Sequence, residues 1–196
     1  MALLNDNQIA SLAFIGGMIS PFAYRHVGDG VISYGVSSFG YDMRLGAKFK
    51  VIHTSRGAHC GAVIDPKCAE GIVFDDVVAD KYFDLPAFSY ALGYSVERFK
   101  LPRDVSAIVI GKSTYARCGL MVNCTPMEAG WEGHLTIELF NTLDTPIRLY
   151  IDEGICQALF FKGEPPMTSY ADRNGKYQGQ AAEPVTAKVK RGENHE

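Results

Sequence analysis

Short runs in which apolar and polar residues alternate occupy most of the chain, a pattern typical of half-buried β-strands. The runs are rich in β-branched and aromatic residues and are separated by Gly, Pro and Asp. Because no helical pattern of about ten residues or more lies between them, they favour an all-β barrel or sandwich over a parallel α/β sheet. The strands predicted in this way span residues 48–53, 88–97, 105–110, 134–141, 146–151 and 155–161.

Only the beginning of the chain carries a helical pattern. Asp6 is placed to cap a short helix there, and the glycines at positions 16–17 end it. The apolar face of this predicted helix consists of Ile9, Leu12 and Ala13.

The composition changes after Phe161, where Pro, Gly and charged residues replace the large aliphatic ones. Such a segment cannot form a core of its own. We therefore predict a β-barrel domain over residues 1–163 and a flexible tail over 164–196, with about the last fifteen residues disordered. Residues 170–180 are expected to order over a ligand, because this stretch offers stacking and hydrogen-bonding groups, namely Tyr170, Lys176, Tyr177 and Gln180.

The composition narrows the class of protein. A length of 196 residues suits one domain at roughly 100 to 200 residues per domain, and 47% hydrophobic residues supply a sizeable core. The net charge of −3 disfavours a general nucleic-acid binder, so an anionic ligand would need a local cationic pocket. No apolar run of about 18 residues is present, and we expect no membrane span.

The cysteines and the first residues indicate a compartment. Five cysteines, an odd number without a C-x-x-C pair, argue against both a disulfide framework and a zinc ribbon. The first residues lack a basic start and reach Asn5 and Asp6 before any apolar stretch of signal-peptide length. We therefore expect a cytoplasmic protein.

The densest polar chemistry lies in GKSTYARCGL, residues 111–120, directly after a predicted strand. It is not a phosphate-binding P-loop, because Ser106 stands where that motif requires a glycine. If Ser113 begins a short helix, free backbone N–H groups favour an anion there, with Lys112 beside them and Arg117 one turn on. A capped helix with an exposed arginine explains the same residues, and both interpretations remain open.

A glutamate stands in the middle of the predicted strand 134–141. The alternation places His134, Thr136, Glu138 and Phe140 on one face and Leu135, Ile137 and Leu139 on the other. Glu138 either faces water or serves as a general base on a rigid strand, a role worth about 10² to 10⁴ in rate.

A glutamine stands in the last predicted strand, 155–161. Gln157 shares its face with Ile155, Leu159 and Phe161, so we expect it to be buried and to need hydrogen-bond partners. Its amide either reads a base edge or ribose of a ligand, or pairs with backbone.

Taken together, the segments GKSTYARCGL, AGWEGHLTIELFN, EGICQALFF and YADRNGKYQGQ resemble the dCTP deaminase family, which is related to the trimeric dUTPases. FGYDMRLG, residues 39–46, resembles an early strand of that family, and the resemblance runs from about Asp6 to Gln180. It implies a distorted, dUTPase-like β-barrel, assembled as a homotrimer with active sites between subunits. It also implies the reaction of dCTP with water to give dUTP and ammonia, which supplies dUTP for dUMP and dTTP synthesis.

The resemblance implies a role for each matching residue. Glu138 would be the catalytic proton shuttle, and Ser113 and Arg117, the latter from a neighbouring subunit, would support the water and the carboxylate. The stretch that would hold the triphosphate is Lys112, Ser113, Thr114, Tyr115, Ala116 and Arg117. The other residues that would line or close the nucleotide site are Glu128, Thr136, Ile137, Gln157, Tyr170, Lys176 and Gln180.

The loop over residues 119–131 departs from the family pattern, because it is about two residues shorter. In the family a backbone carbonyl of this loop helps to place the water. Which of Cys124, Thr125 and Pro126 would provide it here stays open.

The sequence lacks the H-x-E and P-C-x-x-C motifs of zinc deaminases, so we expect metal-free activation of water and no protein-held zinc. Magnesium would arrive on the triphosphate. One rival is a bifunctional enzyme that also hydrolyses dUTP, because Glu128 stands where related dUTPases carry their water-activating Asp. Another is a non-catalytic nucleotide-binding regulator on the same fold. Regulation by dTTP is left open.

Overall fold

The computed structural model describes residues 2–52 and 64–189, and the predicted all-β class is confirmed. Two short helices, α1 (Asp6–Gly16) and α2 (Ser113–Ala116), and a 3-10 turn, η2 (Pro66–Gly71), accompany the strands. The strands are β1 (Ala2–Leu3), β2 (Ile19–Ser20), β3 (Gly35–Ser37), β4 (Gly40–Arg44), β5 (Lys48–Ile52), β6 (Phe74–Val78), β7 (Tyr82–Leu85), β8 (Tyr90–Lys100), β9 (Val105–Gly111), β10 (Leu120–Asn123), β11 (Glu132–Asn141), β12 (Ile147–Tyr150) and β13 (Gly154–Lys162).

All six strands predicted from the alternation are present as β5, β8, β9, β11, β12 and β13, although His53, at the end of the first, lies outside the described residues. The short strands β6, β7 and β10 were not predicted. β6 carries two adjacent aspartates, which obscure its period, and β7 is held by its partner β12, where Arg148 pairs with Asp84 at 2.8 Å. Pairing, which a local pattern does not display, therefore defines these strands.

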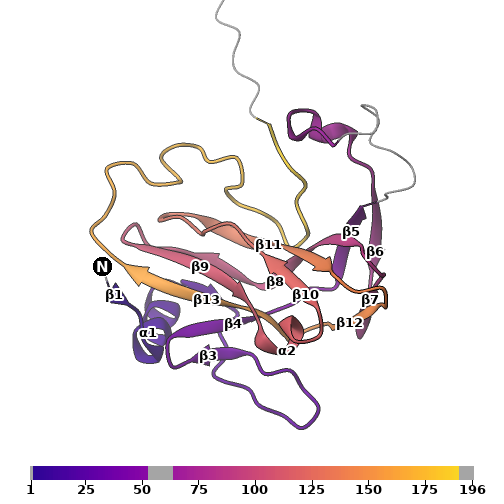
Figure 1. Ribbon diagram of the computed structural model, residues 1–196. Helices are drawn as coiled ribbons and strands as arrows, with labels where there is room; N and C mark the ends of the chain where they lie inside the picture. The colour runs from indigo at the N-terminus through magenta and orange to yellow at the C-terminus, as the bar shows by residue number, and fades with distance from the viewer. Residues whose placement is uncertain (1, 53–63, 190–196) are drawn as a thin grey trace, which may run out of the picture.

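Two larger sheets enclose the core. One has the order β1-β13-β4-β3, with β9 also paired to β13, and the other the order β10-β11-β8-β5-β6, with β2 paired to β8. β12 and β7 form a separate pair. Among the described residues these strands do not close into one hydrogen-bonded barrel, and Figure 1 shows the two sheets curving around each other. The rings of Phe99 on β8 and Phe160 on β13 lie 6.4 Å apart, where the sheets meet.

Helix α1 begins as expected, but its cap is Asn5 and not Asp6. The Asn5 side chain accepts a hydrogen bond from the Gln8 backbone N–H at 3.0 Å, and the Gln8 side chain accepts one from the Asn5 N–H at 3.0 Å. This reciprocal pair satisfies two backbone donors, so Asn5 caps the helix better than its neighbour can. Ile9 and Ala13 are buried as predicted, and Gly17, at φ +65°, ends the helix.

A buried ion pair joins the two sheets. The guanidinium of Arg44 on β4 donates to the Glu97 carboxylate on β8 at 2.8 Å, and the Arg44 backbone N–H donates to its second oxygen at 2.9 Å. The Tyr41 hydroxyl adds a third donor at 3.3 Å. Glu97 is fully buried, and burial raises its pKa while the hydrogen bonds from Arg44 oppose that rise.

We expect Arg44→Met to destabilise the fold by about 3 to 5 kcal/mol, because it leaves the Glu97 carboxylate buried without its cation. The double variant Arg44→Met/Glu97→Leu should recover most of the loss. Urea unfolding at pH 7 measures both free energies. Arg148→Met serves as the control, since its ion pair with Asp84 lies on the surface. A loss for Arg44→Met as small as that of the control would contradict the assigned role of the ion pair.

Candidate active site

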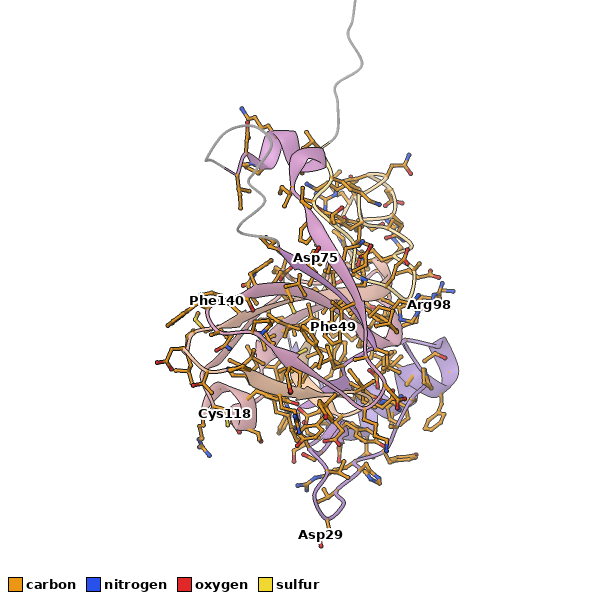
Figure 2. All side chains as sticks on the ribbon, turned by 90° about the vertical axis from the view of Figure 1, so that its right-hand side faces the viewer. Asp29, Phe49, Asp75, Arg98, Cys118 and Phe140 are labelled. Atoms are coloured by element: carbon orange, nitrogen blue, oxygen red, sulfur yellow. The ribbon has the colours of Figure 1, made fainter. Side chains whose placement is uncertain are left out.

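Glu138 lies on the outer face of β11, half-buried. Leu135, Ile137 and Leu139 point into the core, which confirms the predicted alternation along this strand. Phe140, two residues beyond Glu138 on the outer face, is 38% exposed. Figure 2 shows Phe140 and Cys118 at one edge of the molecule and Arg98 at the opposite edge.

The neighbours of Glu138 come from the two strands that flank β11. Asn123 on β10 and Leu92 on β8 stand directly opposite it in the two registers. The Asn123 side-chain amide donates a hydrogen bond to a Glu138 carboxylate oxygen at 3.3 Å, whereas Leu92 is buried and has no polar group to offer. The carboxylate therefore lies between one neutral donor and one apolar side chain.

This environment sets the protonation of Glu138. Burial raises its pKa to about 7, while its own backbone N–H and the hydrogen bond from Asn123 act in the opposite direction. A carboxyl group with a pKa near neutrality can both accept and release a proton at physiological pH, as general acid–base catalysis requires. Glu138 is the described carboxylate best suited to proton transfer.

Tyr90, on β8, is a further neighbour that the sequence did not single out. Burial and the charge of Glu138 raise the pKa of Tyr90 to about 12, so it stays a protonated phenol at neutral pH. Cys124 follows Asn123 and lies next to the buried Cys156, whose pKa is raised by burial and by this second thiol. Strand register alone brings Tyr90, Leu92 and Asn123 close to Glu138. The local sequence pattern does not reveal that register.

The helix α2 forms where the sequence indicated. The Arg117 N–H donates to the Ser113 carbonyl at 3.1 Å, so these residues are one turn apart, and both side chains are exposed together with Thr114 and Ala116. Tyr115 is buried, and its hydroxyl accepts a hydrogen bond from the Tyr150 N–H at 2.9 Å. Only the backbone of Tyr115 is therefore open to a ligand.

Lys112, which precedes α2, has a partner within the chain. Its ammonium lies 2.6 Å from a carboxylate oxygen of Asp42 on β4. The two side chains are 12% and 16% exposed, so the pair is largely withdrawn from water. The positive charge expected to meet a triphosphate is thus already balanced by an aspartate.

The described residues give Glu138 no hydrogen bond from Ser113 or Arg117. The Thr142 N–H bonds to the carbonyl of Gly119, just after α2. Thr142 is four residues beyond Glu138 on the same strand path, about 14 Å away at about 3.4 Å per residue. No ion pair joins the Glu138 carboxylate to the Arg117 guanidinium among the described residues.

The tail lies across the beginning of β11. The Gln180 carbonyl accepts a hydrogen bond from the His134 N–H at 3.0 Å, and the Thr136 hydroxyl donates to the Gln180 side chain at 3.3 Å. Gly133, at φ +148°, permits this approach, because a Cβ there would lie 2.7 Å from the Gln180 nitrogen. The Val185 N–H donates to the Thr136 hydroxyl at 3.1 Å. The tail thus reaches within two residues of Glu138.

Other tail residues hold the segment against itself. The Tyr170 hydroxyl accepts from the Tyr177 N–H at 3.0 Å, and the Lys176 ammonium donates to the Lys188 carbonyl at 2.9 Å. The indole N–H of Trp131, at the start of β11, donates to the Tyr177 carbonyl at 2.9 Å. Residues 170–188 therefore form a folded strap over the sheet, visible in Figure 1 as the yellow-orange segment.

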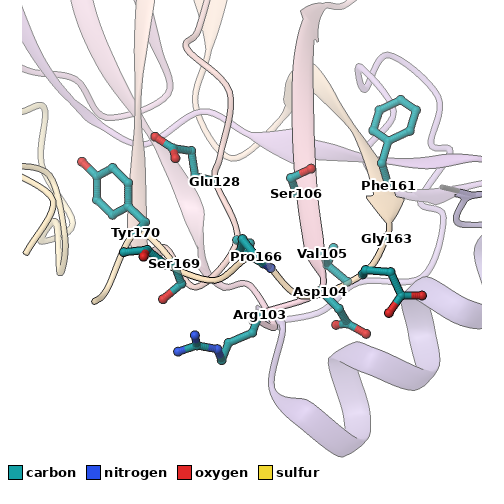
Figure 3. A pocket seen from close by; sticks show the side chains of 13 residues that line it. Arg103, Asp104, Val105, Ser106, Glu128, Phe161, Gly163, Pro166, Ser169 and Tyr170 are labelled. Atoms are coloured by element: carbon teal, nitrogen blue, oxygen red, sulfur yellow. The ribbon is translucent and has the colours of Figure 1, made fainter. Parts of the chain in front are cut away.

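A cavity of about 310 Å³ lies beside the segment that leads into this strap, residues 163–170. Figure 3 shows Glu128 and Tyr170 on one side of it and Ser106 and Phe161 on the other. The Glu128 carboxylate pairs with the guanidinium of Arg173. Glu138 is not part of its lining, so the cavity and the buried carboxylate are distinct features.

Gln157 is half-buried, and the expectation that it is buried is wrong. The core face of β13 consists of Cys156, Ala158 and Phe160. Because both faces of β13 are rich in apolar residues, the alternation alone did not indicate which face points inward. The Gln157 amide donates to the Ser37 hydroxyl at 3.0 Å, a side-chain partner rather than backbone. Ile137 is fully buried, so only its backbone is available to a ligand.

Within residues 2–52 and 64–189, no group of three or more His, Cys, Asp or Glu side chains is placed to hold a metal ion. In the same part of the chain, no helix has the length and apolar character needed to cross a bilayer.

Comparison with known proteins relates the chain to one family. The family model described as dCTP deaminase-like matches residues 3–163. A dCTP deaminase of Chloroflexus aggregans is 50% identical over 181 residues, which cover 92% of this chain and 95% of that protein. A dCTP deaminase of Pelagibacter ubique is 48% identical over 181 residues, which cover 92% and 96%.

A solved structure shares the fold. The 2'-deoxycytidine 5'-triphosphate deaminase from Agrobacterium tumefaciens has a TM-score of 0.62 with this chain at 22% sequence identity. The match covers 82% of this chain and 48% of that chain, so this chain spans about half of the solved protein.

The raised pKa of Glu138 predicts a pH-dependent cost in stability. The folded chain holds the Glu138 proton more tightly than the unfolded chain, so stability falls as pH rises from about 4.5 to about 7. We expect Glu138→Gln to be more stable than wild type at pH 8 and not at pH 4.5. Urea unfolding at both values measures this, with the exposed Glu164→Gln as control. An equal change in the free energy of unfolding at both pH values would argue against a cost from burying the Glu138 charge.

Proposed function

This chain belongs to the dCTP deaminase-like family, and we propose on that premise that it is a dCTP deaminase, which hydrolyses dCTP to dUTP and ammonia. The single observation that carries the proposal is the position of Glu138. A half-buried carboxylate with a pKa of about 7 lies on a rigid strand in a chain 50% identical to a dCTP deaminase. A regulator that only bound nucleotide would have no use for such a group.

The carboxylate acts as a proton shuttle. As the water oxygen adds to C4 of the cytosine, Glu138 takes a proton from the water and the C4–N3 electron pair moves to N3. Glu138 then delivers that proton to N3. In the second half it takes the proton of the new C4 hydroxyl and passes it to the amine. The bond between C4 and the amine nitrogen breaks, and ammonia leaves with the electron pair of that bond. C4 becomes the carbonyl carbon of uracil.

The environment of Glu138 supports both halves of this cycle. A carboxyl with an ordinary pKa would be too weak a base for the water proton, whereas one buried without any donor would hold its proton throughout. Ser113, the Arg117 guanidinium and one carbonyl among Cys124, Thr125 and Pro126 would fix the nucleophilic water. The tail residues Tyr170, Lys176 and Gln180 would close over the nucleotide, whose triphosphate would bring Mg²⁺ as its counterion.

We further propose a homotrimer in which neighbouring subunits complete each site. The support is that Arg117 makes no ion pair with Glu138 within the described part of the chain, and that the surface beside Glu138 is apolar. Met121 on β10 and Phe140 on β11 stand opposite each other and are 62% and 38% exposed. A subunit seated on this strip would cover it and bring its own Arg117 to the carboxylate. A cytoplasmic location is consistent with the free thiols of Cys118 and Cys124.

A bifunctional enzyme is the main alternative. Glu128 is an exposed carboxylate beside the 310 Å³ cavity, but Arg173 engages it. Its extra methylene relative to aspartate would displace an activated water, and about 1 Å of misplacement can cost about 10²-fold in rate. We therefore expect dUTP to accumulate. Formation of dUMP and pyrophosphate from dCTP would identify the bifunctional enzyme instead.

Glu138→Gln should abolish ammonia release from dCTP and leave dCTP binding largely intact. The amide keeps the size of the side chain but cannot accept the water proton. Ammonia release and calorimetric dCTP binding are measured with magnesium, with and without a zinc chelator. Glu164→Gln, an exposed glutamate in the tail, is the matched control. Retained turnover in Glu138→Gln, or release that the chelator stops, would rule out the metal-free mechanism proposed.

Mixing two inactive variants tests the shared site. Arg117→Ala and Glu138→Gln should each be inactive alone. After equimolar subunit exchange, about one quarter of the sites would combine an intact Glu138 with an intact Arg117 from the neighbour, and activity should return to about that fraction of wild type. Native mass spectrometry verifies that mixed trimers have formed. Mixed trimers without activity would place both residues of a site in one chain.

A further inference from the structure

We infer that Asn123 is a positioning residue for the reaction, whose side-chain amide orients the Glu138 carboxylate and stabilises its charged form. This inference rests on the proposed function, because it assigns a role to Asn123 only if Glu138 transfers protons.

The register of two strands brings the two side chains together. β10 and β11 pair over four positions, with Asn123 directly opposite Glu138 and Val122 opposite Leu139. Side chains directly opposite each other in an antiparallel pair project from the same face, with Cβ atoms about 4.5 to 5.5 Å apart. The 3.3 Å hydrogen bond from the Asn123 amide follows from this placement. It holds the carboxyl plane in one orientation.

Asn123 is the only side chain among the described residues that donates a hydrogen bond to this carboxylate. Across the other edge, the opposing residue is the apolar Leu92. The remaining group that favours the charged form is the backbone N–H of Glu138 itself, which no substitution removes. Loss of the Asn123 amide would therefore leave the Glu138 backbone N–H as the one hydrogen bond that opposes the effect of burial.

The neutral amide suits a group that must work in both directions. An arginine or lysine at this position would lower the pKa of Glu138 far enough to prevent proton delivery to N3. An apolar residue would raise the pKa above 7 and leave the carboxyl protonated, unable to accept the water proton. One neutral hydrogen bond lowers the proton affinity of Glu138 only moderately. Both uptake of the water proton and its delivery to N3 therefore stay accessible.

Other titratable groups surround the pair without replacing this contact. Tyr90 on β8, whose pKa is raised to about 12 by burial and by the charge of Glu138, is an uncharged phenol at pH 7. On β5, Lys50 stands beyond Leu92 and is paired with Asp76 at 2.6 Å. On β11, the His134 ring bonds to the Ser95 carbonyl. None of these groups donates a hydrogen bond to the Glu138 carboxylate.

The test is the pH profile of kcat/KM for dCTP in the full-length enzyme. Asn123→Leu removes the donor, so the acid limb should move up by about one pH unit, with activity about tenfold lower at pH 6.5 and near wild type at pH 9. Asn123→Asp places a second carboxylate there and should move the limb further. Val78→Ala, an exposed apolar residue on β6, is the control and should leave the limb in place.

A direct titration separates this inference from the proposed function. ¹³C NMR of the glutamate carboxyl carbons, with Glu138 assigned through Glu138→Gln, should show its pKa raised in Asn123→Leu. Loss of activity that is equal at every pH, or an unmoved Glu138 titration, would overturn the inference while an inactive Glu138→Gln keeps the function in place. Turnover by Glu138→Gln would overturn the proposed function. The NMR titration would then test only whether the Asn123 hydrogen bond lowers the pKa of Glu138.

Discussion

The buried contact between Arg44 and Glu97 is the constraint on which the arrangement of the two sheets depends. Glu97 is excluded from water, so its carboxylate needs the three donors that Arg44 and Tyr41 supply from the opposite sheet. Any displacement of β4 relative to β8 would break these bonds and leave a buried charge. β8 also pairs with β11 along most of the length of β11. The Arg44–Glu97 contact therefore also fixes the position of the strand that carries Glu138. The site thus inherits its rigidity from a contact made by the neighbouring strand β8.

The two faces of β11 have different roles, one in the core and one at the candidate site. Leu135, Ile137 and Leu139 anchor the strand in the core, which leaves the opposite face free for polar groups. Along that face the tail covers Thr136, Asn123 bonds to Glu138, and the end of α2 meets Thr142. The rise of the strand, about 3.4 Å per residue, sets these groups at intervals along the face.

The alternation of apolar and polar residues predicted features that depend on residues close together in the sequence. Glu138 was found because its strand alternates cleanly, whereas the face of Gln157 was misassigned because β13 is apolar on both sides. The helix cap was displaced by one residue, from Asp6 to Asn5, although Gln8 at the third helical position is the signal that favours Asn5. The contacts of Asn123 with Glu138, and of Lys112 with Asp42, depend on strand register and on chain segments far apart, which no single-sequence period encodes.

The state of Glu138 links catalysis and stability through one balance. Burial makes the carboxyl basic enough to take a proton from water, and the same burial disfavours its charged form in the folded chain at neutral pH. A cationic partner would remove that cost but would also remove the basicity. The fold instead supplies one neutral hydrogen bond, and the tail's hold on Thr136 brings further covering atoms toward the carboxylate. The reactive group is therefore kept near the point where its two protonation states are equal, by burial on one side and by its own backbone N–H and the Asn123 amide on the other.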